Sequence, residues 1–252
     1  LKSMGHEVWP VHTVHFSNHP GYEHVRGSVV PATEITALFE GLVLNGWTRD
    51  CQAVLGGYMG SVENARATQA AVVDLKKSHS NAEYLCDPVM GDNPEGVYVS
   101  QDLVDYYRYD ACHRADVLTP NVFELELLTG MRCTSPAEVQ KAALSLIALG
   151  VDTVLVTSVG EYQNLATIGA MAITADQAWQ VEAPRLEQTA KGAGDAFAAL
   201  WLGHRLQGLP IELALSQAVS GVHHLLTESQ NKPAGELPLV QCVQEAIKPA
   251  NL

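Results

Sequence analysis

The chain has 252 residues, 47% of them hydrophobic and 17% charged, and its formal net charge is −13. These values predict a folded protein with a substantial core and exclude a disordered chain. The acidic balance, without a run of lysine or arginine, argues against nucleic acid or an anionic membrane as a partner.

The five cysteines show no CxxC spacing, and the ten histidines include no HExxH motif. We therefore expect free thiols in a reducing cytoplasm and no zinc site. No apolar run is long enough to span a bilayer, so a membrane protein is not expected.

Residues 1–5 have the pattern of a helix end, with Gly5 as the C-cap, so a first strand and most of a first helix are expected to be missing before them. Strands are then predicted at residues 8–16, 53–55, 83–86, 116–118 and 153–156. Helices are predicted at 61–77, 121–129, 135–150, 195–206, 211–227 and 237–246. Strands that alternate with helices form a parallel sheet covered on both faces.

The pattern changes at residues 170–181, where two strands flank the turn 174–177. This predicts an antiparallel hairpin at one edge of the sheet. No repeat, linker or low-complexity tract interrupts the chain, so residues 1–252 are expected to form a single domain.

The most informative segment is Lys191-Gly192-Ala193-Gly194-Asp195, which precedes an apolar helix. A helix that begins after Gly-Ala-Gly offers free N–H groups and a positive dipole end to an anion. An acid there would repel a phosphate unless it has chemistry to perform, such as taking a proton from an attacking hydroxyl. The same segment also suits a turn with Asp195 as N-cap, and by itself it does not decide between the two.

Ligands of open α/β sheets bind at the carboxyl ends of the strands. Polar residues follow the predicted strands at 13–19, 56–58, 87–88, 119–121, 157–158 and 192–195. This organisation is typical of a nucleotide-using transferase. The chain has no GxxxxGK[ST] motif, and no GxGxxG follows a strand, so neither a P-loop nor a dinucleotide-binding fold is favoured.

Together these segments resemble the ribokinase-like superfamily and, within it, the pyridoxal kinases. The likeness rests on six segments in family order: 13–19 (TVHFSNH), 57–58 (GY), 86–92 (CDPVMGD), 119–124 (TPNVFE), 156–158 (VTS) and 192–195 (GAGD). The resemblance implies a three-layer α/β/α sandwich with a mostly parallel central sheet and an antiparallel edge hairpin. It also implies ATP-dependent phosphorylation of the 5′-hydroxyl of pyridoxal, a step of vitamin B6 salvage.

By resemblance, Asp195 is the general base, and Gly192, Ala193 and Gly194 form the anion hole for the transferring phosphoryl group. The positions implied around ATP and its Mg²⁺ are Asp87, Asp92, Asn121 and Glu124. Thr119 and Thr157 match positions that hold the phosphates and a monovalent cation such as K⁺, Thr157-Ser158 matches a nucleotide-contacting pair, and Arg185 is placed near the nucleotide. Lys191 is a candidate to offset phosphate charge. Each of these positions has a structural alternative: Asn121 and Glu124 as a helix cap, Asp87 in a turn, Thr119 as a strand residue, and Lys191 and Arg185 on the surface.

For the vitamin, the implied positions are Thr13, His15, the turn His19-Pro20-Gly21, and Tyr58. Pro20 departs from the family, which often has a threonine there, and proline has no side-chain donor. The family also carries a serine on a strand before Leu1, and segment 184–192 is shorter than usual.

Two other functions stay open. One is another ribokinase-like small-molecule kinase, acting on hydroxymethylpyrimidine or a sugar, and the other is a non-catalytic module that binds pyridoxal phosphate. The intact Gly-Ala-Gly-Asp segment argues against the second, and the Phe-Ser-Asn-His segment argues against the sugar kinases. The resemblance further implies a homodimer.

Overall fold

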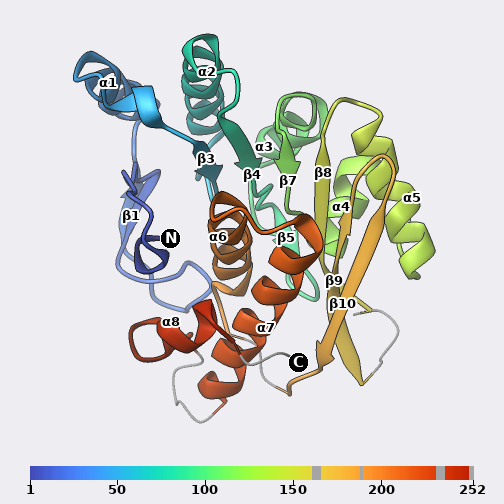
Figure 1. Cartoon of the computed structure of the whole chain (residues 1–252). Helices are drawn as coiled ribbons and strands as arrows, with labels where there is room; N and C mark the ends of the chain where they lie inside the picture. The colour runs from blue at the N-terminus through green and yellow to red at the C-terminus, as the bar shows by residue number, and fades with distance from the viewer. Residues whose placement is uncertain (161–165, 188–189, 231–235, 250–252) are drawn as a thin grey trace.

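The computed structural model describes residues 1–160, 166–187, 190–230 and 236–249. Its central sheet has six strands in the order β10-β9-β8-β7-β4-β3 (Figure 1). The strands are β3 (Ala53–Gly56), β4 (Glu83–Cys86), β7 (Val117–Leu118), β8 (Thr153–Val159), β9 (Thr167–Ile173) and β10 (Ala178–Pro184). Strands β3, β4, β7 and β8 are parallel, whereas β9 and β10 are antiparallel at the edge, as the sequence predicted.

Helices cover both faces of this sheet. One layer holds α2 (Val62–Ser78), α3 (Gln101–Tyr109), α4 (Val122–Thr129) and α5 (Pro136–Ile147). The other holds α6 (Ala193–Leu206), α7 (Ile211–Ser229) and α8 (Leu239–Ile247). Successive residues of a strand point to opposite faces, so Val154 and Val156 belong to the first core and Leu155 to the second. The three-layer sandwich is therefore observed.

Helices α1 (Ala32–Leu44) and α3 and strands β2 (Gly27–Val29), β5 (Gly91–Asp92) and β6 (Gly96–Val97) were not expected from the sequence. Helix α1 packs on α2, and α3 belongs to the first core. Two short antiparallel hairpins, β1 (Val14–Phe16) with β2 and β5 with β6, lie outside the central sheet. Short 3₁₀ turns complete the fold at η1 (Lys2–Met4), η2 (Trp47–Asp50) and η3 (Ala111–His113).

The predicted strand at residues 8–16 was too long and wrongly implied a place in the main sheet. Only Val14–Phe16 is extended and paired, and its partner is β2. Pro10 has no N–H for a ladder, and the strand pairs locally because its chain returns after one loop. Gly5 does adopt the left-handed conformation expected of a C-cap, with φ of 90°. Among the described residues, no helix combines the length and apolar character needed to cross a membrane.

Candidate active site

Four neighbouring parallel strands bring their following residues to one edge of the sheet. The ladder continues past their ends: the Asp87 N–H donates to the Gly56 carbonyl (2.8 Å) and the Thr119 N–H to the Cys86 carbonyl (3.1 Å). Thr157, on the next strand β8, forms a parallel β-bridge with Asn121. The sheet therefore sets predicted site residues from distant parts of the chain side by side.

Asp87 and Thr119 are buried at this edge, 7% and 5% exposed. Burial, reinforced by the negative charge of Asp195, raises the pKa of Asp87 to about 7. The Thr119 hydroxyl lies near enough to lower that pKa, yet its Oγ1 has no partner in good hydrogen-bond geometry among the described residues. A buried acid beside an unpartnered hydroxyl oxygen is an environment that a cation would complete.

Asn121 and Glu124 form the predicted capping box at the start of α4. The Asn121 Oδ1 accepts from the Glu124 N–H (2.8 Å), and the Glu124 Oε2 accepts from the Asn121 N–H (2.9 Å). They also hold the segment after β4, because Glu124 Oε1 accepts from the Met90 N–H (2.9 Å) and Asn121 Nδ2 donates to the Gly91 carbonyl (2.9 Å). Burial, and then the charge of Asp87, raises the pKa of Glu124 well above its ordinary value.

Asp92 lies on β5, half-buried, at the end of the segment that Glu124 and Asn121 hold. Its Oδ1 accepts from the Asn93 N–H (2.9 Å), and burial raises the pKa of this carboxyl, an effect that the charge of Glu95 strengthens. The structure therefore brings Asp87, Asp92 and Glu124 into one acidic neighbourhood. No group of three or more His, Cys, Asp or Glu side chains in metal-binding geometry occurs within the described part of the chain.

Gly192 is the N-cap of α6 and adopts a left-handed conformation, with φ of 88°, which glycine accepts without strain. Helix α6 then starts at Ala193, so its first N–H groups are those of the Gly-Ala-Gly segment and Asp195 stands in its first turn. A Cβ placed on Gly57 would lie 3.7 Å from Asp195 Oδ1, so the end of β3 approaches this carboxylate. Asp195 is exposed to water, yet the surrounding protein raises its pKa by desolvation.

His19 lies in the loop after β1, close enough to Asp195 for their charges to interact. Its Nδ1 accepts from the Gly21 N–H (3.0 Å), so in the neutral ring Nε2 carries the proton. Burial and the charge of Lys191 lower the pKa of His19, while Asp195 raises it. The predicted turn 19–21 is therefore near the base, and Pro20 and Gly21 are exposed there.

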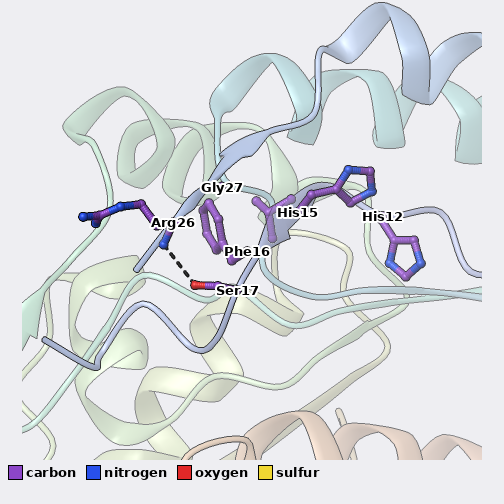
Figure 2. A pocket seen from close by; sticks show the side chains of 7 residues that line it. His12, His15, Phe16, Ser17, Arg26 and Gly27 are labelled. Carbon is purple, nitrogen blue, oxygen red and sulfur yellow. Dashed lines mark hydrogen bonds between the residues drawn. The ribbon is translucent and has the colours of Figure 1, made fainter. Parts of the chain in front are cut away.

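Other predicted substrate positions lie on the same hairpin or at its contact with β3. The Thr13 hydroxyl donates to the Tyr58 carbonyl (2.6 Å), and this bond joins the β1–β2 hairpin to the end of β3. His15 stands beside His12, with ring centroids 5.8 Å apart, and lines a shallow hollow of about 640 Å³ that Figure 2 shows. Asp195 and Tyr58 are not among the residues that line this hollow. The structure thus places His19 near Asp195, whereas His15 lines a hollow that Asp195 does not line.

Thr157 and Ser158 interrupt the pairing of β8 with β9, where the register shifts between Val156 and Val159. Ser158 has a φ of 60°, a backbone conformation that non-glycine residues seldom adopt outside special sites. The Arg185 guanidinium donates to the Gly160 carbonyl (3.0 Å), just beyond this bulge. In the predicted short segment 184–192, residues 188–189 lie outside the described residues.

Sequence reasoning missed Tyr98, which follows β6. Tyr98 is 52% exposed, but desolvation by the surrounding protein raises the pKa of its phenol. The charges of Glu124, Asp92, Asp87 and Asp195 raise this pKa further, so the hydroxyl belongs to the acidic neighbourhood. It missed also an ion pair between Lys191 Nζ and Glu95 Oε1 (3.1 Å). No spacing in the sequence predicts the position of Tyr98 or this ion pair, because both depend on the unexpected β5–β6 hairpin.

A three-layer sandwich with Gly-Ala-Gly-Asp at a helix start, beside buried acids at the sheet's carboxyl edge, defines a ribokinase-like small-molecule kinase. The family described as phosphomethylpyrimidine kinase matches residues 49–240. Pyridoxal kinase PdxY of Rubrobacter xylanophilus is 39% identical over 99% of this chain and 87% of its own length; the corresponding enzyme of Corynebacterium diphtheriae is 36% identical over 98% and 87%.

Solved structures agree with this class. The pyridoxal kinase of Leishmania donovani in complex with ADP and pyridoxamine has a TM-score of 0.92 at 25% identity, covering 100% of this chain and 89% of that one. The pyridoxal kinase of Entamoeba histolytica has a TM-score of 0.89 at 27% identity, with 97% and 86% covered. The chain belongs to the phosphomethylpyrimidine kinase family and, within it, to the pyridoxal kinases.

Proposed function

We propose that this protein transfers the γ-phosphoryl group of ATP to the 5′-hydroxyl of pyridoxal. The observation that carries the proposal is Asp195 in the first turn of α6, directly after a glycine-flanked anion cradle and beside buried acids. The similarity to PdxY pyridoxal kinases over 98–99% of this chain supports the vitamin as acceptor.

In this reaction Asp195 takes the proton of the substrate hydroxyl. The hydroxyl oxygen attacks the γ-phosphorus, and the bond from that phosphorus to the β-phosphate bridging oxygen breaks, so that ADP leaves. The N–H groups of the segment 192–194 stabilise the charge on the transferring phosphoryl oxygens, because the first N–H groups of a helix have no partner within the helix. The raised pKa of Asp195 brings its basicity closer to neutral pH, which favours proton transfer.

We assign Mg²⁺ to the acidic neighbourhood, with Asp87, Asp92 and Glu124 acting directly or through water, and K⁺ or a similar ion near Thr119 and Thr157. The donors are all oxygens, and the buried Asp87 carboxyl with its raised pKa and the Thr119 Oγ1 without a hydrogen-bond partner among the described residues fit the binding of a cation. When bound, Mg²⁺ neutralises charge on the triphosphate. The absence of a complete protein cage in the described residues suits a metal that keeps waters and phosphate oxygens as ligands.

The nucleotide side is assigned to Asn121, Thr157, Ser158 and Arg185, around the β8 bulge and the start of α4. For the vitamin we assign Thr13, the turn His19-Pro20-Gly21, and Tyr58, whose ring is suited to pack on a pyridine. The nearness of His19 to Asp195 supports this placement. His15 stays a prediction, because it lines a hollow that Asp195 and Tyr58 do not line. Pro20 offers no side-chain hydrogen bond to the substrate.

A second candidate, phosphorylation of hydroxymethylpyrimidine, is favoured by the match to the phosphomethylpyrimidine kinase family over residues 49–240. The deciding experiment incubates purified protein with Mg-ATP and pyridoxal, pyridoxine, hydroxymethylpyrimidine or ribose, and identifies products by mass. We expect phosphorylated pyridoxal at the highest kcat/KM. A much higher value for the pyrimidine favours the second candidate, and no product from any acceptor leaves a non-catalytic binder.

We also propose a cytoplasmic homodimer. All five cysteines are described and free, which suits a reducing compartment. The surface of α1 and η2 exposes Leu38, Val43, Leu44 and Trp47, of which Leu44 is 87% exposed. Analytical ultracentrifugation should give a dimer mass, and Leu44→Glu should shift it toward the monomer; a wild-type monomer at micromolar concentration contradicts the assembly.

A further inference from the structure

Lys191 stands at the junction of three segments around the proposed active site. It directly precedes the Gly192 cap of α6, and its Nζ pairs with Glu95 of the β5–β6 hairpin (3.1 Å). Its Cε lies 3.5 Å from where a Cβ on Gly21 would stand, so it also reaches the loop that carries His19. Its charge acts on both His19 and Asp92, lowering the pKa of each.

The backbone of Lys191 is anchored while its side chain is held weakly. The residue forms a β-bridge with Glu236, whose carboxylate accepts from the Tyr22 hydroxyl (3.4 Å). In contrast, the side chains of the Lys191–Glu95 pair are 46% and 49% exposed. Ion pairs this exposed contribute little to stability and exchange partners at small cost.

The acids around Lys191 create an electrostatic problem for a kinase. Asp87, Asp92, Glu124 and Asp195 share the neighbourhood into which a polyanionic nucleotide must enter. A γ-phosphoryl group carries more negative charge than one carboxylate and offers three oxygens to an ammonium. It therefore competes favourably with Glu95 for the same lysine.

We propose that Lys191 is a positioning residue for the phosphoryl group: its ammonium leaves Glu95 and pairs with the γ-phosphoryl oxygens when ATP binds. Glu95 holds the lysine near the anion cradle in the empty enzyme and offsets its charge there. The exchange gives the enzyme a preference for ATP over ADP, because only ATP carries the γ-phosphoryl group that replaces Glu95 as the partner of the lysine. This inference rests on the proposed phosphoryl transfer from ATP but not on the identity of the acceptor.

The test is nucleotide binding without turnover. Calorimetry measures, with Mg²⁺ present, the Kd of an ATP analogue with a methylene between the β- and γ-phosphates, and the Kd of ADP. Lys191→Met should weaken the analogue about tenfold, the scale of one charge-assisted contact, and change ADP less than twofold. Lys191→Arg should restore most of the analogue's affinity, and Glu95→Gln should tighten it by releasing the lysine.

Lys77→Met is the matched control, because Lys77 forms an exposed pair with Asp74 (2.7 Å) on α2. It should change neither Kd, and thermal unfolding should show all variants folded. Equal weakening of analogue and ADP by Lys191→Met, no weakening, or a weaker analogue after Glu95→Gln would each overturn the exchange. Wild-type protein that binds neither nucleotide overturns the proposed function itself, whereas a negative result confined to Lys191→Met overturns only its role.

Discussion

At the scale of single residues, Asp195 combines accessibility with a raised pKa. It is exposed in the first turn of α6, as a base that meets a substrate must be, and desolvation raises its pKa. Asp87, one of the acids behind it, is buried. Burial disfavours its charged form, so its pKa reaches about 7. This difference in exposure suits Asp195 to proton transfer and the buried acids to binding the cation that accompanies the phosphates.

Asp195→Asn removes the proton acceptor and keeps the shape of the side chain. We expect kcat to fall by about two orders of magnitude or more, the scale of a lost general base, while the Kd of Mg-ATP changes little. Steady-state kinetics with pyridoxal and calorimetry with nucleotide measure the two effects. Near-normal turnover in this variant removes Asp195 from the role of base.

The pH dependence of the reaction follows from the same carboxyl. The base must be ionised, so kcat/KM should fall as pH drops through its pKa. Because desolvation raises that pKa, the acid limb should lie above the ordinary aspartate value near 4. A protonated His19 lowers it, so His19→Gln should move the limb to higher pH, whereas His79→Gln at the end of α2 should not. A limb at or below pH 4 contradicts this view.

At the scale of elements, the start of α4 does two tasks with the same two side chains. Asn121 and Glu124 cap their helix, and they also hold Met90, which follows β4, and Gly91, the first residue of β5. The segment that contains these two residues connects Asp87 to Asp92, so the cap fixes the distance between two site acids. A local helix signal thus has a consequence for residues 30 and 34 positions away in the chain.

Asn121→Ala should lower the free energy of unfolding by about 1 kcal/mol, the usual cost of a lost N-cap, and should also weaken Mg-ATP binding. Ser135→Ala is the matched control, because Ser135 caps α5 through the same kind of bond to the Glu138 N–H. It should cost similar stability without loss of nucleotide affinity. Chemical denaturation and calorimetry measure the pair, and equal nucleotide affinity in both variants contradicts the second task of Asn121.

At the scale of the whole molecule, the central sheet carries two cores and one functional edge. Leu155 is fully buried on β8, in the core under α6 and α7, while its neighbours Val154 and Val156 belong to the core under α2 to α5. The strand that positions Thr157 is thus held from both faces. We propose on this basis that the chain folds as a single domain.

Leu155→Ala should therefore lower the free energy of unfolding by about 2–5 kcal/mol, through lost apolar burial and a residual cavity. Leu213→Ala is the control, since Leu213 on α7 is 53% exposed and should cost less than about 1 kcal/mol. Urea unfolding followed by circular dichroism gives both values in one cooperative transition. Separate transitions, or equal costs at the two sites, contradict a shared core.

The sequence by itself determined the features that short-range interactions decide. The α/β alternation, the β9–β10 hairpin, the capping box at Asn121 and the left-handed Gly5 cap all follow from periodicity or from bonds within a few residues. The Gly-Ala-Gly-Asp start of α6 was visible for the same reason.

Only the tertiary structure decided which distant side chains meet. The Lys191–Glu95 pair and the approach of His19 to Asp195 join segments 96 and 176 residues apart. The position of Tyr98 beside the acids depends on a short hairpin with a weak periodic signal. Their positions come from packing of whole elements, because loop closure and layer contacts, rather than local propensity, bring such segments together.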